Sequence, residues 1–330
     1  FRQHGWIYCM LLNFGGNVGL HGKLDHVVNE FYKAKESPFA ATLEGVGLTM
    51  EGIENNPVMY ELLTELPWRP ERFSGEEWIE GYIAARYGRK DSDVSEAWKI
   101  LAGTIYNAPA SSTQQGTHES VFCARPSMDV TQVSSWAETR DYYWPEDVMD
   151  AAGKMACAAE RFRGNWNFEY DLIDIVRQAV AEKGRLVYRE MQEAYRDKDM
   201  ETFGKISDCF LQLILLQDRL LSTMPEFMAG TWLGAARSLG TSSREKDWLE
   251  WNARVQITTW GDRTASETGG LRDYAHKEWS GLLRDVYYRR WKVWLDALAE
   301  SMRTGVPADS IDFYLMDEAW DMWYDKKTEM

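Results

Sequence analysis

The sequence predicts a short α/β region followed by a large all-helical region. Eight of the 25 glycines lie within residues 1–52, where short apolar runs alternate with glycine-containing turns. Farther along the chain, apolar residues recur at helical spacing, and Pro225 is the one proline between residues 146 and 306. The first pattern is typical of βα units and the second of packed helices, so we expect two domains, residues 1–72 and residues 73–330.

The first region contains two candidate βα units. Residues 6–12 and 45–50 are apolar runs typical of buried strands, and each is followed by a polar or glycine-containing loop. After the second run, Asn56 and Pro57 have the residue types that favour the N-cap and the first turn of a helix. Glu51 is therefore expected at the carboxyl end of a strand.

The second region is expected to be helical except over residues 106–144, an irregular segment with two prolines and a Ser/Thr/Gln-rich stretch at 111–117. Such segments often line functional sites. The apolar spacing and the flanking cap residues predict helices over residues 73–87, 92–105, 146–163, 169–198, 199–222, 224–238, 243–258, 271–303 and 309–325.

Composition argues against several classes of protein. The net charge of -15 repels phosphate groups, so we expect neither a nucleic-acid partner nor an anionic membrane surface. The longest apolar run, residues 210–216, is much shorter than the roughly 20 residues of a membrane-spanning helix, so no membrane insertion is expected. The four cysteines have no CxxC spacing and are expected to be buried thiols. The five histidines lack metal-ligand spacing, and we expect no metal or other cofactor.

Glu51 is the first candidate for catalysis. In (β/α)8 enzymes, catalytic groups lie at the carboxyl ends of strands, because the strand ends converge on one mouth. The ordinary alternative is a carboxylate that serves the N-terminus of the next helix. Residues 13–17, Asn-Phe-Gly-Gly-Asn, follow the first strand and combine amides with a glycine turn, but their spacing is not that of a dinucleotide-binding loop. From this motif alone, a tight structural turn is the favoured interpretation.

Aromatic residues suggest a class of ligand. The chain has 16 Trp, 16 Tyr and 12 Phe, and the apolar C–H faces of sugars bind against aromatic rings. Most of these residues, such as Trp291, are explained more simply as core. Trp260 differs, because it ends a helical stretch and precedes the polar loop 261–270. A tryptophan at such a position is a candidate for contact with a ligand.

Several blocks of the sequence resemble the alpha-N-acetylglucosaminidases of glycoside hydrolase family 89, and they occur in the family's order from residue 6 to at least residue 291. The strand-proximal blocks are residues 9–17 and 47–56, the latter with Thr-Met-Glu-Gly-Ile at 49–53. The remaining blocks are residues 68–69, 86–88, 97–98, 106–107, 250–254, 256–261, 273–275 and 279–282.

The resemblance implies a retaining exo-hydrolase that removes terminal alpha-linked N-acetylglucosamine from a glycan. It also implies a fold of three domains, of which this chain would hold the last βα units of a (β/α)8-type barrel followed by a large all-helical domain that completes the pocket. Because the chain opens with Phe1 and a strand-like segment, we expect it to be the C-terminal part of a longer protein. A periplasmic or secreted bacterial enzyme is the favoured origin, with a lysosomal location if the source is an animal.

The same resemblance assigns roles to individual residues. Glu51 matches the family nucleophile, and the acid/base Glu of the family lies upstream of residue 9, outside this chain. The fragment alone is therefore expected to be inactive. The substrate-binding positions matched on the barrel side and then on the helical side are Leu11, Phe14, Trp260, Leu271 and Tyr274.

Two other interpretations stay open. The first is a glycan-binding or scaffold protein without catalytic activity that has kept the helical domain, although the intact block around Glu51 favours the enzyme. The second is an unrelated (α/α)-type enzyme, which would need paired carboxylates among candidates such as Asp208, Asp218 and Asp273. The sequence does not indicate the natural glycan or the oligomeric state.

Overall fold

The chain forms two compact units. Our computed structural model describes residues 4–52, 55–109, 116, 119–134 and 141–322. Unit 1 comprises residues 1–118 and 140–179, and unit 2 comprises residues 119–139 and 180–330. This division reflects spatial contacts, so the domain limits at residues 72 and 73 stay a prediction.

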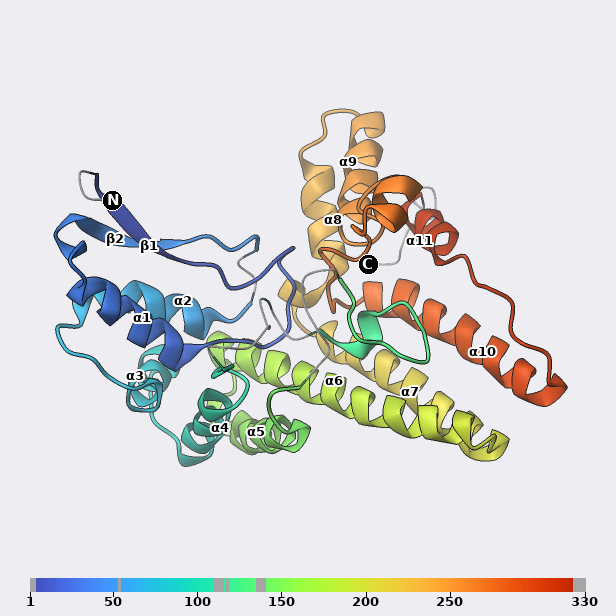
Figure 1. Cartoon of the computed structure of the whole chain (residues 1–330), viewed down its shortest axis with the longest axis horizontal. Helices are drawn as coiled ribbons and strands as arrows, with labels where there is room; N and C mark the ends of the chain where they lie inside the picture. Colours follow the sequence, from blue (N-terminus) through green and yellow to red (C-terminus); the bar gives the residue numbers. More distant parts are fainter. Residues whose placement is uncertain (1–3, 53–54, 110–115, 117–118, 135–140, 323–330) are drawn as a thin grey trace. The chain divides into compact units, whose positions relative to one another are not determined.

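Two parallel strands open unit 1. Strand β1 (Trp6–Met10) pairs with β2 (Leu43–Leu48), and helix α1 (Leu24–Glu36) connects them. Helix α2 (Pro57–Glu65) follows β2, and Figure 1 shows α1 and α2 on the same side of the sheet. The predicted βα units are therefore confirmed. A sheet of two strands, as seen in the described residues, does not test the prediction that these strands belong to a (β/α)8-type barrel.

The two faces of the sheet differ because side chains alternate along a strand. Tyr8 and Val46 pack on the hydrophobic core. On the opposite face, Ile7 is 55% exposed and Cys9 is also exposed. The prediction that the cysteines are buried is wrong for Cys9, Cys157 and Cys209, and Cys123 alone among the four is buried.

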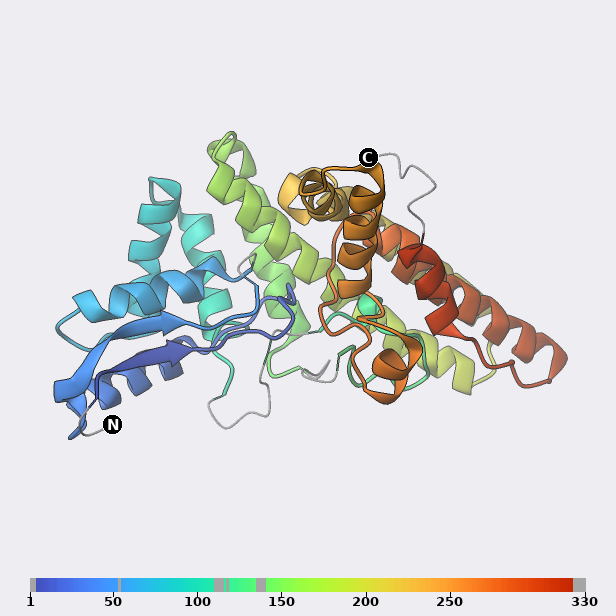
Figure 2. The ribbon, with the colours of Figure 1, turned by 90° about the horizontal axis from the view of Figure 1, so that it is seen from above.

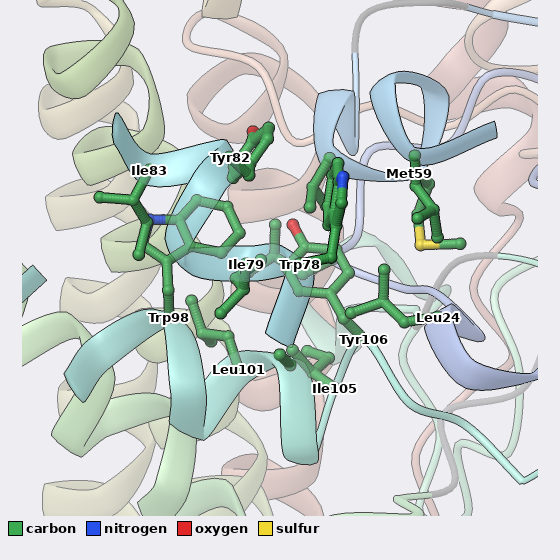
Figure 3. Close-up of a cluster of buried hydrophobic side chains, with 14 of the residues drawn as sticks. Leu24, Met59, Trp78, Ile79, Tyr82, Ile83, Trp98, Leu101, Ile105 and Tyr106 are labelled. Atoms are coloured by element: carbon green, nitrogen blue, oxygen red, sulfur yellow. The ribbon is translucent and has the colours of Figure 1, made fainter. Parts of the chain in front are cut away.

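The core of unit 1 lies between helices and is rich in aromatic side chains (Figure 3). Helices α3 (Gly75–Tyr87), α4 (Ser92–Gly103) and α5 (Pro145–Ala158) complete the unit together with the first part of α6 (Trp166–Arg196). The Tyr82 ring meets Trp98 edge-on at 5.1 Å, and Trp98 stacks on Tyr106 at 5.9 Å. These contacts add to the burial of large apolar surfaces.

Unit 2 is helical in the residues that the structure describes. Its helices besides the end of α6 are α7 (Met200–Leu221), α8 (Ala229–Ser238), α9 (Ser243–Gln256), α10 (Tyr288–Thr304) and α11 (Phe313–Asp321). Figures 1 and 2 both show α8 beside α9. Trp291 of α10 is fully buried, as expected, and its indole Nε1 donates a hydrogen bond to the Phe122 carbonyl at 3.0 Å.

Three predicted helices differ from the structure. The helix expected over residues 224–238 begins at Ala229, after a separate 3-10 turn at Pro225–Phe227. The helix expected from residue 271 begins at Leu283, with a π-helical turn (Leu283–Tyr287) before α10. The preceding segment turns instead, because Asp273 (φ 54°) and Gly281 (φ 90°) have left-handed backbone conformations. Helix α11 is shorter than the predicted 309–325, whose last three residues lie outside the described part.

The irregular segment expected over residues 106–144 is described only in part. Residues 110–115, 117–118 and 135–140 lie outside the described residues. The described part includes a short 3-10 helix at Val121–Cys123. None of the helices in the part of the chain that the structure covers is both long enough and apolar enough to span a membrane.

Candidate active site

Glu51 lies three residues beyond β2, where its side chain is exposed. The Gly15 N–H, in the loop that leaves β1, donates a hydrogen bond to Glu51 Oε2 at 2.7 Å. Gly15 and Gly16 have φ angles of 62° and 65°, which favour glycine. The parallel pairing of β1 and β2 therefore brings the glycine turn and the carboxylate together at the carboxyl ends of both strands.

A buried amide network holds the segment next to Glu51. The side chain of Asn13 is fully buried, and its Nδ2 donates to the Gly52 carbonyl at 3.2 Å and to Asn55 Oδ1 at 3.1 Å. Asn55 Nδ2 in turn donates to the Asn17 carbonyl. These bonds join the loop after β1 to the loop after β2. Because Gly52 directly follows Glu51, the network constrains where the carboxylate lies.

Asn56 adds a second connection between the same loops. Its Oδ1 accepts from the His21 N–H, and its Nδ2 donates to the Gly19 carbonyl, both at 3.0 Å. The sequence correctly predicts Asn56 at the N-cap of α2 with Pro57 in the first turn. The side chain, however, makes no capping hydrogen bond, because it binds the neighbouring loop instead.

Two of the predicted substrate-binding residues lie in the loop after β1. Leu11 is 48% exposed, and Phe14 is half-buried beside the glycine turn. Sequence reasoning missed the roles of Asn55 and of the Gly15 N–H as partners of this site. The glycine pair at residues 15 and 16 indicated the turn in which the Gly15 N–H lies, whereas nothing in local spacing singles out Asn55.

The three predicted residues of unit 2 lie on one segment after α9. The rings of Trp260 and Tyr274 form an edge-to-face pair with centroids 5.0 Å apart, and both side chains are half-buried. The Tyr274 N–H donates to the Leu271 carbonyl at 3.1 Å, which places Leu271 in the same turn. Together they form a small aromatic and apolar surface.

Trp260 has an unusual backbone conformation. Its φ angle is 61°, and its N–H donates to the Val255 carbonyl at 2.7 Å. The left-handed conformation costs a residue with a side chain about 1–2 kcal/mol, and such strain persists only where the surroundings impose it. The position of this tryptophan is therefore maintained by contacts elsewhere in unit 2.

A buried ionic cluster lies beneath this segment. Asp273 binds Arg290 through two hydrogen bonds of 2.9 and 3.1 Å, and the Arg290 Nε donates to Asp317 at 2.8 Å. All three side chains are 1% exposed. Burial lowers the pKa of Arg290, but the two carboxylates raise it well above its ordinary value. This ion pair, together with a 2.7 Å bond from the Asp273 N–H to the Thr258 carbonyl, explains why the chain turns here instead of forming a helix.

The carboxylates considered for an (α/α)-type enzyme have separate surroundings. Asp208 is exposed on α7. Asp218 is buried and accepts from the Gly281 N–H at 2.7 Å, and Asp273 is bound to Arg290. Asp218 and Asp273 thus stabilise two different turns, and the structure does not group them into a catalytic pair.

Unit 1 thus consists of parallel βα units with a fixed carboxylate at their strand ends, and unit 2 is a helical unit with an aromatic pair. Comparison with known proteins assigns this combination to a class, the glycoside hydrolases. Residues 1–70 match the model of the alpha-N-acetylglucosaminidase (NAGLU) tim-barrel domain, and residues 78–329 match that of the NAGLU C-terminal domain. The chain belongs to the alpha-N-acetylglucosaminidase family.

Individual relatives support the assignment of this chain to the family. The human alpha-N-acetylglucosaminidase is 33% identical over 315 residues, which cover 95% of this chain and 40% of the human protein. A family 89 glycoside hydrolase from Clostridium perfringens, solved with PUGNAc, is 36% identical and superposes with a TM-score of 0.92 over 98% of this chain. The same hydrolase with two Glu-to-Gln substitutions, bound to its substrate GlcNAc-alpha-1,4-galactose, gives a TM-score of 0.91. The chain spans about two fifths of the length of these relatives.

Proposed function

We propose that this chain is part of a retaining, exo-acting alpha-N-acetylglucosaminidase and that Glu51 is its catalytic nucleophile. The observation that carries the proposal is the Glu51 carboxylate at the carboxyl end of β2, oriented by the Gly15 N–H at 2.7 Å. The names of the relatives supply the sugar, since the human protein is an alpha-N-acetylglucosaminidase and the Clostridium substrate carries alpha-linked GlcNAc.

The proposed reaction has two steps. In the first, a Glu51 oxygen bonds to the anomeric carbon while the bond to the leaving oxygen breaks, and a second carboxyl group gives that oxygen its proton. In the second, a water oxygen bonds to the anomeric carbon, its proton passes to the second carboxylate, and the Glu51 ester bond breaks. Retaining enzymes hold the two carboxyl groups about 5–5.5 Å apart.

The second carboxyl group is proposed to lie outside residues 1–330. Resemblance to the family places it upstream of the block that begins at Cys9, and the chain spans about two fifths of its relatives. We therefore expect residues 1–330 alone to have little hydrolase activity. The amide network around Asn13 would serve the reaction by holding the attacking carboxylate in one orientation, which lowers the entropic cost of reaching the transition state.

The sugar is proposed to contact Leu11 and Phe14 from unit 1 and Trp260, Leu271 and Tyr274 from unit 2. The edge-to-face pair of Trp260 and Tyr274 offers a ring face for the apolar C–H surface of a sugar. Hydrogen bonds to the N-acetyl group would then distinguish this sugar from glucose, because a polar group left unpaired in the site penalises the wrong substrate.

The nucleophile assignment is tested in the intact enzyme with an aryl alpha-N-acetylglucosaminide as substrate. The Glu51→Gln variant is expected to lose about a thousandfold or more in kcat, since removal of a catalytic group costs on that order. Glu44→Gln, at an exposed position of β2, is the matched control and is expected to keep the wild-type rate.

A second measurement separates a nucleophile from a general acid. In Glu51→Ala, added azide can occupy the space of the lost carboxylate and attack the anomeric carbon, giving a glycosyl azide of β configuration. An α-configured azide, or a Glu51→Gln variant with its rate intact, would exclude Glu51 as the nucleophile. An inactive wild type that still binds the glycan would instead favour the binding-protein interpretation.

The cellular location is a further part of the proposal. Relatives come from a bacterium and from human, so the family occurs in both kinds of organism. We propose a periplasmic or secreted location if the source is bacterial and a lysosomal one if it is an animal. A protease-accessibility assay on intact source cells tests the bacterial alternative.

A further inference from the structure

Two buried threonines directly precede Trp260 and share one carboxyl group. Thr258 and Thr259 are 1% and 2% exposed, and Asp321, the last residue of α11, is 1% exposed. Thr258 Oγ1 contacts Asp321 Oδ1, and Thr259 Oγ1 donates to Asp321 Oδ2 at 2.8 Å. One carboxyl group of α11 thus binds both residues that lead into the strained tryptophan.

A count of protons defines the state of this carboxyl group. Thr258 Oγ1 also lies 2.8 Å from the Arg254 carbonyl oxygen, which can only accept a hydrogen bond. The single hydroxyl proton of Thr258 can make a full hydrogen bond to only one of these acceptors, the carbonyl or an ionised carboxylate. If Asp321 is protonated, its own O–H donates to Thr258, Thr258 donates to the carbonyl, and each contact contains one proton.

The surroundings of Asp321 agree with the neutral form. Burial raises the pKa of its carboxyl group to about 7, and the nearby Asp317 adds to the increase. The threonine hydrogen bonds and Arg290 act in the opposite direction. The titratable groups around Asp321 are Asp317 and Tyr314 on α11, Arg290 on α10, and Arg254 with its partner Glu250 on α9.

The same threonine segment also reaches Tyr274. The Thr258 carbonyl accepts the Asp273 N–H at 2.7 Å, and Asp273 directly precedes Tyr274. Displacement of Thr258 would therefore disturb both rings of the pair, Trp260 through the chain and Tyr274 through this hydrogen bond. Among the described residues, Asp321 is the group whose two carboxyl oxygens contact both threonine hydroxyls.

We propose that Asp321 is a positioning residue for Trp260 and that it acts as a neutral carboxylic acid through Thr258 and Thr259. The inference rests on the proposed function, in which Trp260 contacts the sugar. It predicts that asparagine replaces Asp321 well, because the Nδ2 of Asn donates to Thr258 while its Oδ1 accepts from Thr259.

The test uses the intact enzyme and measures KM and kcat for an aryl alpha-N-acetylglucosaminide between pH 5 and pH 8. Asp321→Asn is expected to keep KM within about twofold of the wild type at pH 5. As the pH rises toward 8, KM of the wild type should increase severalfold relative to the Asn variant, because ionisation removes the proton shared with Thr258. Asp321→Ala should raise KM about tenfold across the range, with kcat changed less.

Glu318→Gln is the matched control, since Glu318 is an exposed carboxyl of the same helix, and it should follow the wild type at every pH. An Asn variant as impaired as the Ala variant would overturn the inference, because an ionised carboxylate would then be required. If Asp321→Ala does not fold, Thr259→Val takes its place and is expected to raise KM while Asp321→Asn does not.

Trp260→Ala separates this inference from the proposed function. A raised KM in Trp260→Ala, together with a pH dependence of KM that is the same in the wild type and Asp321→Asn, would reject the role of Asp321 and leave the proposed function intact. An unchanged KM in Trp260→Ala would instead reject the contact between this residue and the sugar, and the positioning role with it.

Discussion

At the scale of single residues, Asn13 offers a test of how the Glu51 segment is held. Replacing it by alanine removes the donor to the Gly52 carbonyl and to Asn55 Oδ1 in a fully buried site. The single hydroxyl proton of Tyr60 can still serve one of these two acceptors, but not both. Leaving the other acceptor unpaired costs about 1–3 kcal/mol, so we expect Asn13→Ala to lower the free energy of unfolding by that amount. Because Gly52 adjoins Glu51, kcat/KM should also fall at least tenfold.

Urea unfolding and steady-state kinetics of the intact enzyme check this prediction. Asn167→Ala is the matched control, since Asn167 is exposed and donates to a single carbonyl, that of Arg86. It should change the unfolding free energy by less than about 0.5 kcal/mol. An Asn13→Ala variant as stable and as active as this control would show that the network does not position Glu51.

Single residues were predictable where local sequence determines their place. Glu51 follows an apolar run closely enough that its location at a strand end could be predicted, and the glycines at 15 and 16 indicated a turn. The partner relation between Gly15 and Glu51 spans 36 residues and depends on strand pairing, which no local pattern encodes. For the same reason the prediction for Cys9 failed, since the outward face of β1 is defined by packing and not by residue type.

At the scale of elements, the largest error concerns residues 271–281, which have helical spacing but are not helical in the structure. Periodicity measures how apolar residues are distributed, and this segment is apolar enough to satisfy it. What overrides it is the pairing of Asp273 with Arg290, seventeen residues later, together with left-handed conformations at Asp273 and Gly281. The long helices, by contrast, were predicted within a few residues at most of their ends.

Arg290→Met tests whether this ion pair maintains the turn. The variant removes the guanidinium that binds both buried carboxylates, Asp273 and Asp317. Arg125 stays 3.1 Å from Asp317 but 4.0 Å from Asp273, so Asp273 loses its close cationic partner. Removing one partner of a buried ion pair costs about 3–5 kcal/mol, so we expect a loss of that size in the free energy of unfolding. Arg303→Met, at an exposed position of the same helix, should cost less than about 1 kcal/mol. Equal losses in the two variants, measured by urea unfolding, would contradict a structural role for the buried pair.

At the scale of the whole molecule, the family was predictable because its blocks occur in order along almost the entire chain. The two compact units are defined by spatial contacts, and unit 1 contains helices α3 to α5 as well as the strands. These units do not test the predicted domain limits at residues 72 and 73. The residues proposed for the site lie in both units, Glu51 in unit 1 and the pair of Trp260 and Tyr274 in unit 2. Stability of either unit is therefore a condition for the proposed activity.

The pH dependence of stability gives a prediction for the folded chain as a whole. The pKa of Asp321 is raised from 3.8 to about 7 by burial, so between these values the folded protein keeps a proton that the unfolded chain has lost. The folded state then binds more protons, and stability decreases as the pH rises, levelling off above about pH 7. At about 1.4 kcal/mol per pH unit, this carboxyl group should reduce the free energy of unfolding by about 3 kcal/mol between pH 5 and pH 8.

Asp321→Asn isolates this contribution, because asparagine does not titrate and other ionisable groups stay the same. Urea unfolding of the wild type and of the variant at pH 5 and pH 8 should show a wild type that loses about 3 kcal/mol more than the variant. Equal pH dependence in both proteins would mean that Asp321 is ionised throughout this range. The proton that the geometry requires between Asp321 and Thr258 would then have to come from another arrangement of the threonine hydroxyl, in which the bond to the Arg254 carbonyl is given up.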